Sequence, residues 1–103
     1  MVKVSVFYPY SAGSKFDMNY YVEKNMALVG SKLGAACKKI SVEQGIAGGA
    51  SGLPPTYIAM GHLLFDSVEA FQAAFSPHAA EILADVANYT TIQPIIQVSD
   101  VKM

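Results

Sequence analysis

The hydrophobic residues of this chain alternate between two spacings, and the order of these spacings restricts the possible folds more than any other feature. Apolar residues occupy every second position in Val2–Tyr8, which predicts a β-strand because alternate side chains of a strand lie on one face. In Asp17–Leu33 apolar residues recur every three or four positions, which predicts an amphipathic helix. Asp17 suits the N-cap of this helix, and Gly34 suits its end. The stripe predicted to be buried comprises Met18, Val22, Met26, Val29 and Leu33.

The rest of the chain predicts two more strands, a second helix and a last strand. Alternation returns in Cys37–Gln44, and Tyr57–Phe65 has apolar residues on both faces, as in a strand covered on both sides. Asp66–Glu69 resembles a capping box that opens a helix, and Ser76-Pro77 is expected to interrupt that helix. Ile92–Val101 is the last predicted strand. The buried stripe of the second helix is expected at Val68, Phe71, Phe75, Ala79, Ile82 and Val86.

This order of elements, β-α-β-β-α-β, predicts a ferredoxin-like α+β fold, in which a four-stranded antiparallel sheet carries two helices on one face. The 103 residues have room for one such domain, so we assign residues 1–103 to it. The term describes topology alone, because the single cysteine, Cys37, can neither hold an iron–sulfur cluster nor form an internal disulfide. The fold leaves the second face of the sheet open.

Apolar residues are more abundant than the core of so small a domain can hold. They make up 52 % of the chain, whereas charged residues make up only 15 %. Typical soluble domains have about 25 % charged residues, and a domain of this size buries only about 60–70 % of its extended-chain surface on folding. We therefore expect the surplus to be buried between two copies of the chain, around a ligand, or both. Two sheets packed face to face would cover the open face.

Charge and motif content argue against several classes of partner. All 7 basic residues are lysine, against 8 acidic residues, and the net charge of −1 excludes the basic surface of a nucleic-acid-binding protein. No stretch approaches the ~20 apolar residues of a membrane span. The strand pattern begins at Val2 with no signal peptide, so we expect a cytoplasmic protein. His62, His78 and Asp85 lack the spacing of a metal motif, and no dinucleotide fingerprint is present, so we expect neither metal nor cofactor.

Two polar residues stand out against apolar surroundings. On a helix, the nearest neighbours of Asn25 lie three and four positions away, and those on the predicted buried side are apolar or aromatic. The Asn25 amide therefore needs a hydrogen-bond partner, which a ligand could supply. The amide could instead reach water or a backbone carbonyl. His62 lies on an apolar strand face, where it could transfer protons, orient a ligand, or simply bond to a neighbour in the core. Five tyrosines suit a mostly apolar pocket with a few hydroxyl groups, although core packing explains most of them equally well: Tyr8, Tyr20, Tyr21, Tyr57 and Tyr89.

Several segments together resemble the EthD family, and the resemblance extends over essentially the whole chain. It implies a ferredoxin-like monomer that pairs sheet against sheet in a homodimer, a dimeric α+β barrel. Members of the family usually carry His-x-Pro-Leu in the first helix, whereas in this chain Asn25 stands at the position of that histidine. His62 matches a histidine that is common in closely related sequences. The segments that carry the resemblance are Val2–Pro9, Phe16–Tyr21, Gly61–Phe71, Asp85–Thr90 and Pro94–Gln97.

The resemblance implies a range of functions without choosing among them. The family takes its name from a gene cluster for degradation of the xenobiotic ethyl tert-butyl ether, and similar barrels include isomerases, cofactor-independent monooxygenases and lyases. Because Asn25 cannot titrate, His62 is the candidate catalytic residue, and Asn25, Tyr8 and Tyr21 are candidate ligand-binding residues of the same pocket. The preferred interpretation is a homodimer that binds or transforms a small hydrophobic or aromatic metabolite without a cofactor. The alternatives are a non-catalytic metabolite-binding module and a structural dimerisation module.

Overall fold

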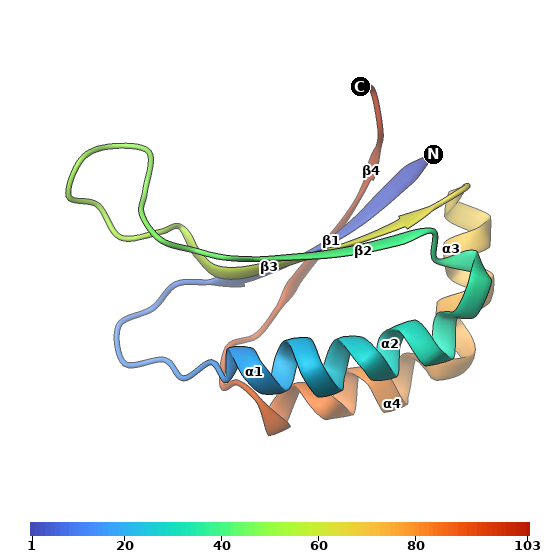
Figure 1. Cartoon of the computed structure of the whole chain (residues 1–103), viewed down its shortest axis with the longest axis horizontal. Helices are drawn as coiled ribbons and strands as arrows, with labels where there is room; N and C mark the ends of the chain where they lie inside the picture. Colours follow the sequence, from blue (N-terminus) through green and yellow to red (C-terminus); the bar gives the residue numbers. More distant parts are fainter.

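Four antiparallel strands form one sheet in the order β2-β3-β1-β4. The computed structural model describes all residues from 1 to 103. Every helix lies on the same face of the sheet, and the other face carries none (Figure 1). The ferredoxin-like α+β architecture predicted from the spacing of apolar residues is thus confirmed. The strands are β1 (Val2–Pro9), β2 (Lys39–Gln44), β3 (Tyr57–Phe65) and β4 (Ile95–Asp100).

The first helical segment has the predicted ends but contains a π-helical turn. α1 covers Met18–Tyr20, the π turn η1 covers Tyr21–Asn25, and α2 covers Met26–Leu33. The Asp17 carboxylate accepts a hydrogen bond from the Tyr20 backbone N–H at 3.0 Å, which caps the start of the segment. Gly34 ends α2 with a φ of +62°, a conformation that glycine adopts without steric cost.

The π turn changes which residues of this segment are buried. The Met26 N–H bonds to the Tyr21 carbonyl, five residues back, so this turn holds more residues than an α-helical turn and rotates the side chains after it relative to those before it. Tyr21 and Asn25 are buried, whereas Val22 is 47 % exposed. The predicted burial of Val22 is therefore wrong, because that prediction assumed 3.6 residues per turn throughout.

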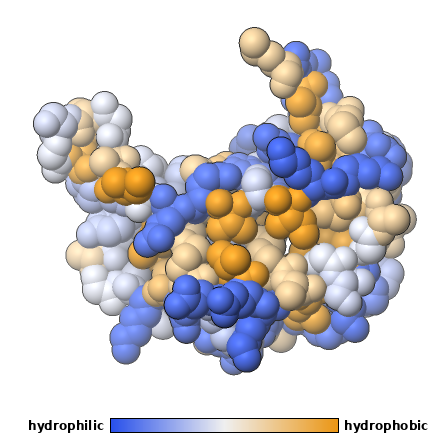
Figure 2. Space-filling model, in the orientation of Figure 1, coloured by the Kyte–Doolittle hydropathy of each residue, from blue (hydrophilic) through white to orange (hydrophobic).

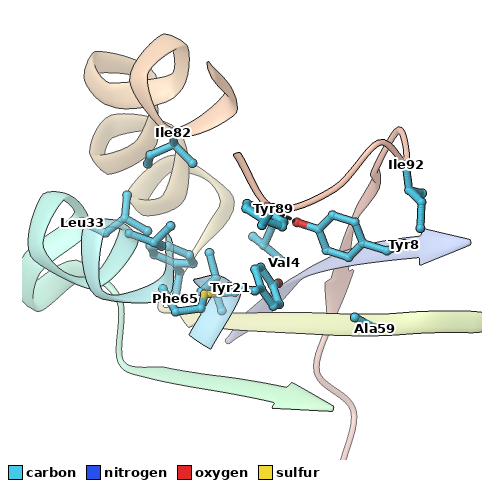
Figure 3. Packing of buried hydrophobic residues seen from close by; sticks show 12 residues of the cluster. Val4, Tyr8, Tyr21, Leu33, Ala59, Phe65, Ile82, Tyr89 and Ile92 are labelled. Carbon is cyan, nitrogen blue, oxygen red and sulfur yellow. Dashed lines mark hydrogen bonds between the residues drawn. The ribbon is translucent and has the colours of Figure 1, made fainter. Parts of the chain in front are cut away.

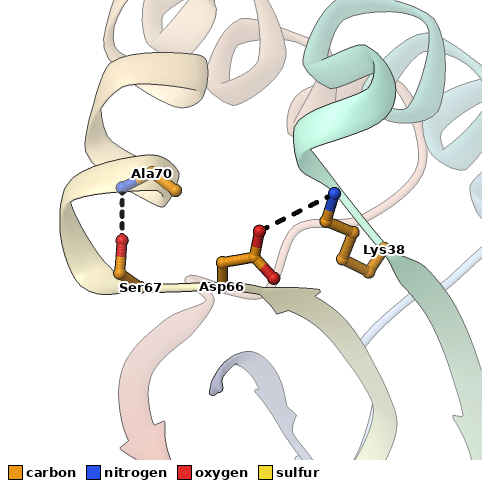
Figure 4. Close-up of polar contacts among 4 residues, drawn as sticks. All are labelled: Lys38, Asp66, Ser67 and Ala70. Carbon is orange, nitrogen blue, oxygen red and sulfur yellow. Dashed lines mark hydrogen bonds and ion pairs between the residues drawn. The ribbon is translucent and has the colours of Figure 1, made fainter.

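The second helical segment begins one residue later than the capping-box pattern indicated. α3 covers Val68–Phe75, and the Ser67 hydroxyl caps it by accepting a hydrogen bond from the Ala70 N–H at 3.1 Å (Figure 4). Asp66, the predicted cap, instead forms an ion pair with Lys38 at 3.7 Å. A hydroxyl at this position satisfies one of the free N–H groups of the first turn as well as a carboxylate would.

The interruption of the second helix at Pro77 is confirmed. The 3₁₀ turn η3 (Ser76–His78) separates α3 from α4 (Ala79–Ala84), and a second 3₁₀ turn, η4, covers Asp85–Asn88. Proline lacks the N–H that an uninterrupted helix would need there. Val68, at the first position of α3, is 37 % exposed rather than buried. None of the helices combines the length and the apolar character that a membrane span requires.

The last strand is shorter than predicted, because the residues before it form a fixed connection. β4 begins at Ile95 rather than at Ile92. The Thr90 hydroxyl donates a hydrogen bond to the Lys15 carbonyl at 2.6 Å and accepts one from the Ile92 N–H at 3.1 Å. The second bond uses the Ile92 N–H, a backbone group that a longer strand could have paired with β1.

The hydrophobic core lies between the sheet and the helical layer (Figure 3). Aromatic rings fill one end of it, where Tyr8 meets Tyr21 edge to face with ring centroids 5.3 Å apart. The Tyr8 and Tyr89 hydroxyls are joined by a hydrogen bond of 2.7 Å. Twelve buried residues form this core: Val4, Tyr8, Tyr21, Met26, Val29, Leu33, Ala59, Leu63, Phe65, Ile82, Tyr89 and Ile92.

The opposite face of the sheet, which we call the open face, has no layer of its own chain above it (Figure 1). The loop that joins β2 to β3 and both ends of the chain rise on this side, away from the helices. Polar and apolar side chains share the face in rows that run across the strands. It carries Lys3, Ser5 and Phe7 from β1, Lys39, Ser41 and Glu43 from β2, Met60, His62 and Leu64 from β3, and Ile95, Gln97 and Ser99 from β4.

The first helical segment approaches the sheet most closely at Gly61 in the middle of β3. A β-carbon added to Gly61 would collide with the Tyr21 hydroxyl and would lie 2.8 Å from the Met26 Cε. Tyr21 itself is completely buried. The absence of a side chain at position 61 therefore makes room for Tyr21 against the backbone of the strand.

We expect Gly61→Ala to lower the free energy of unfolding by about 1–3 kcal/mol, because an extra methyl group in a packed interior forces neighbouring atoms to move. Urea titration followed by tyrosine fluorescence would measure the change. Gly49→Ala is the matched control, since a β-carbon there meets nothing within 4 Å. Equal unfolding midpoints for the two variants would contradict the proposed close contact.

Candidate functional site

An apolar pocket lies between the sheet and the helices, and we call it the helix-side pocket. It is lined by 16 residues, of which 14 are hydrophobic, and encloses a cavity volume of about 50 Å³. Three of the predicted site residues, Tyr8, Tyr21 and Asn25, are among them. Asn25 is the only lining residue with an amide or a charge, and its side chain is buried, with 3 % of the residue exposed. The pocket thus has one strongly polar group in an apolar wall.

A carboxylate holds the Asn25 amide in place. The Asn25 Nδ2 donates a hydrogen bond to Asp85 Oδ2 at 2.9 Å. The other carboxylate oxygen accepts hydrogen bonds from the Tyr20 hydroxyl at 2.7 Å and from the Asn88 Nδ2 at 2.9 Å. Burial alone would raise the pKa of the Asp85 carboxyl, but these three hydrogen bonds outweigh that effect and lower the pKa below its usual value. Asp85 is therefore ionised at neutral pH.

The tyrosine hydroxyls near the pocket remain protonated. Burial raises the pKa of Tyr8, although its hydrogen bond with Tyr89 partly offsets the effect. Burial also raises the pKa values of Tyr21 and Tyr89 far above the usual range, and the neighbouring Tyr8 adds to both shifts. The Tyr21 hydroxyl is fully enclosed and has no hydrogen-bond partner. These groups can therefore donate hydrogen bonds at neutral pH but cannot act as bases.

His62 lies on the open face of the sheet and not in the helix-side pocket. Its Nδ1 is 2.8 Å from the Ser5 hydroxyl, and its Nε2 is 2.9 Å from Glu43 Oε1. Because the carboxylate can only accept, Nε2 carries the proton of the neutral ring, and Nδ1 accepts the proton of the Ser5 hydroxyl. Three strands, β1, β2 and β3, thus contribute one residue each to a hydrogen-bonded array.

The expectation that Asn25 and His62 share one pocket is therefore wrong. Successive side chains of a strand point to opposite faces. In β3 the neighbours of His62, Gly61 and Leu63, face the helices and are buried, so His62 must face the other way. The structure brings together Asn25, Tyr8 and Tyr21 and separates all three from His62 by the thickness of the sheet.

Ser5 and Glu43 were not singled out from the sequence, Asp85 was weighed there only as a metal ligand, and Tyr89 only as one of several tyrosines that suit a pocket. Asp85 holds Asn25 from 60 positions away, and Tyr89 bonds to Tyr8 from 81 positions away. On the open face, Ser5 and Glu43 flank His62 from two different strands. Only a predicted strand register, which places Ser5 and Ser41 directly opposite His62, could have suggested neighbours for this histidine.

A second depression on the surface contains none of the predicted site residues. It lies between the first helical segment and the edge strand β2, on the side seen in Figure 2, where hydrophobic residues gather between the sheet and the helices. It is open to solvent, unlike the helix-side pocket. Its lining consists of Met18, Val22, Met26, Ala27, Ile40, Ser41, Val42 and Gln44.

Comparison with known proteins relates the whole chain to one family. A model of the EthD domain matches residues 13–93. The crystal structure of an EthD-like protein from Ralstonia eutropha JMP134 is 49 % identical in sequence, covers 99 % of this chain and 92 % of that chain, and superposes with a TM-score of 0.95. A search of curated proteins found no match.

More distant structures share the fold alone. An ethyl tert-butyl ether degradation (EthD) family protein from Bacillus halodurans C-125 is 15 % identical, covers 99 % of both chains and has a TM-score of 0.75. A protein from Thermobifida fusca YX, described as dimeric and ferredoxin-like, is 16 % identical, covers 97 % of this chain and 90 % of that chain, and has a TM-score of 0.59. The match over residues 13–93 and the 49 % identity to the Ralstonia protein show that this chain belongs to the EthD family.

Proposed function

We propose that this chain binds a small, largely apolar molecule in the helix-side pocket. The observation that supports this most directly is the buried Asn25 amide in a wall that is otherwise almost entirely hydrophobic. Ligand pockets typically combine such a wall with a few polar groups that orient the ligand. If this position served packing alone, an apolar side chain would make the protein more stable, because burying an amide costs free energy unless its hydrogen bonds are made.

The size of the pocket limits what it can hold without rearrangement. Its volume of about 50 Å³ is smaller than the ~150 Å³ of an engineered apolar cavity that binds benzene. Leu83 and Ile96 line the pocket and are 47 % and 46 % exposed, so they form its rim. We infer that a ring-sized ligand enters between these two side chains and displaces them outward.

Toluene and naphthalene are suitable probes of this pocket. We expect at least one of them to raise the melting temperature of the protein, because a ligand present at about 100 times its Kd stabilises the folded state by ~2.7 kcal/mol. Leu83→Trp, which would fill the rim, should abolish the shift. Val22→Trp is the matched control, since Val22 is as exposed as Leu83 and lies outside the pocket. A shift that survived in Leu83→Trp would place the ligand elsewhere, and no shift with either probe would contradict the binding proposal.

We further propose that two copies of the chain pair through their open faces. The open face includes the partly exposed Phe7, Met60 and Leu64, and the 53 % exposed Ile95. A second sheet packed against this face would bury these side chains. The ferredoxin-like protein from Thermobifida fusca is described as dimeric, which supports a dimer here.

Light scattering should then give twice the mass of the chain at micromolar concentration. Ile95→Asp would place a charge in the proposed interface, and we expect this variant to be a folded monomer with an unchanged far-UV circular dichroism spectrum. Val22→Asp introduces the same charge on the helical side, where it should leave the dimer intact. A monomeric unmodified chain, or dimers of equal stability in both variants, would refute pairing through the open face.

A second candidate function is proton transfer by His62, and a specific array favours it. Ser5 and Glu43 bind the two ring nitrogens, so the tautomer and the orientation of the imidazole are both set. Ser41, His62, Ser5 and Gln97 lie directly opposite one another and form a polar row across all four strands. In a face-to-face dimer this row would lie between the two sheets, where a substrate would meet His62 without any cofactor.

Conversion of a bound compound provides the test of this second function. If any probe is chemically altered by the protein, we expect His62→Ala to abolish the conversion while the dimer stays folded. His62→Gln keeps a polar group of similar reach but cannot carry a proton between pH 5 and 8, so it should be equally inactive. Turnover like that of the unmodified chain in either variant would remove His62 from the mechanism. A bound probe that returns unchanged would favour the non-catalytic binding module.

A further inference from the structure

We propose that Asp85 sets the orientation of the Asn25 amide, so that the helix-side pocket offers its ligand a hydrogen-bond acceptor and selects apolar molecules that carry a hydroxyl or N–H donor. This inference rests on the proposed binding function and adds the chemical class of the ligand. Phenols and small alcohols belong to this class, whereas ethers and ketones of similar size do not.

The Asn25 amide has only one stable orientation. An amide side chain can turn either its NH₂ or its carbonyl oxygen toward a neighbour. The neighbour here is a carboxylate, which accepts hydrogen bonds and has none to donate while it is ionised. The hydrogen bonds from Tyr20 and Asn88 to Asp85 Oδ1 keep this carboxylate ionised and fix its position. Nδ2 of Asn25 must therefore face Asp85, as the 2.9 Å contact shows.

The carbonyl oxygen Oδ1 of the same amide reaches the cavity. Asn25 Oδ1 takes no hydrogen bond within the chain, since its side chain bonds only through Nδ2. The Tyr21 hydroxyl is the only fully enclosed side-chain polar atom without a hydrogen-bond partner. Because Asn25 Oδ1 also has no partner, it is not fully enclosed, and the space that Asn25 lines is the helix-side pocket. The carbonyl oxygen is free to accept a hydrogen bond from a ligand in that space.

The nearby tyrosine hydroxyls are weaker hydrogen-bond acceptors than the Asn25 amide oxygen. Tyr8 and Tyr89 bond to each other at 2.7 Å, so one of the two keeps a free O–H that can donate, and the Tyr21 hydroxyl is sealed against the backbone of Gly61. A ligand with only an acceptor can take that O–H, but it leaves Asn25 Oδ1 without a hydrogen in an apolar cavity. A ligand with a donor completes the hydrogen bonds of the pocket.

Three probes of similar size separate the possibilities. Phenol has a donor, anisole has only an acceptor, and toluene has neither. On the unmodified chain, we expect isothermal titration calorimetry to give a Kd for phenol about fivefold lower than that for toluene, the effect of one net hydrogen bond, and a higher Kd for anisole than for phenol. The order should be the same from about pH 5 to pH 8, because a lowered carboxyl pKa keeps Asp85 ionised throughout this range.

Asp85→Asn tests the positioning role. An amide at position 85 can donate as well as accept, so Asn25 can turn over and offer its NH₂ to the pocket. We expect the preference for phenol over anisole to shrink severalfold in this variant while toluene binds as before. Asp66→Asn is the control, since it makes the same substitution at an exposed carboxylate that pairs with Lys38 outside the pocket, and it should retain the preference.

The outcomes distinguish failure of this inference from failure of the binding proposal. Equal binding of all three probes, tighter binding of anisole than of phenol, or an unchanged preference in Asp85→Asn would overturn the assigned ligand class and leave the pocket as a purely apolar site. No binding of any probe to the unmodified chain would overturn the binding proposal and this inference together. The series of probes on the unmodified chain remains decisive even if Asp85→Asn does not fold.

Discussion

The contact between Tyr21 and the backbone of Gly61 determines how the helical layer lies on the sheet. Tyr21 is completely buried, and it occupies space that any side chain at position 61 would fill. The π turn runs from Tyr21 to Asn25, and both of these residues are buried. π turns often occur at functional sites. Here the last residue of the turn is Asn25, the one amide in the wall of the helix-side pocket.

The two faces of the sheet carry different chemistry, and the strand backbone keeps them apart. The helical face is apolar and holds Asn25 beside Asp85, whereas the open face holds the array of Ser5, His62 and Glu43. A binding pocket on one face and a proton-transfer group on the other do not form a single active site within one chain. If two copies pair through their open faces, His62 becomes enclosed between sheets and the helix-side pocket stays accessible from outside. The two proposed functions can therefore be tested independently.

The elements that the sequence predicts best are those that the local spacing of apolar residues decides. β3 was predicted with its observed bounds, Tyr57–Phe65, and the topology and the role of Pro77 were also correct. Val22 was misplaced because a π turn depends on how the helix fits the sheet, which the spacing of apolar residues does not reveal. The N-cap is Ser67 rather than Asp66, although both residue types can cap a helix, and Asp66 instead pairs with Lys38.

The sequence by itself determined the fold, the family resemblance and the residues worth inspecting, because periodicity and short motifs are local properties of a chain. The tertiary structure alone decided which of those residues act together. Asn25 and Asp85 lie 60 positions apart, and their pairing depends on two helical segments meeting above the sheet. His62 belongs with Ser5 and Glu43 rather than with Asn25, because strand pairing brings β1, β2 and β3 side by side and the alternation of β3 turns this histidine away from the helices.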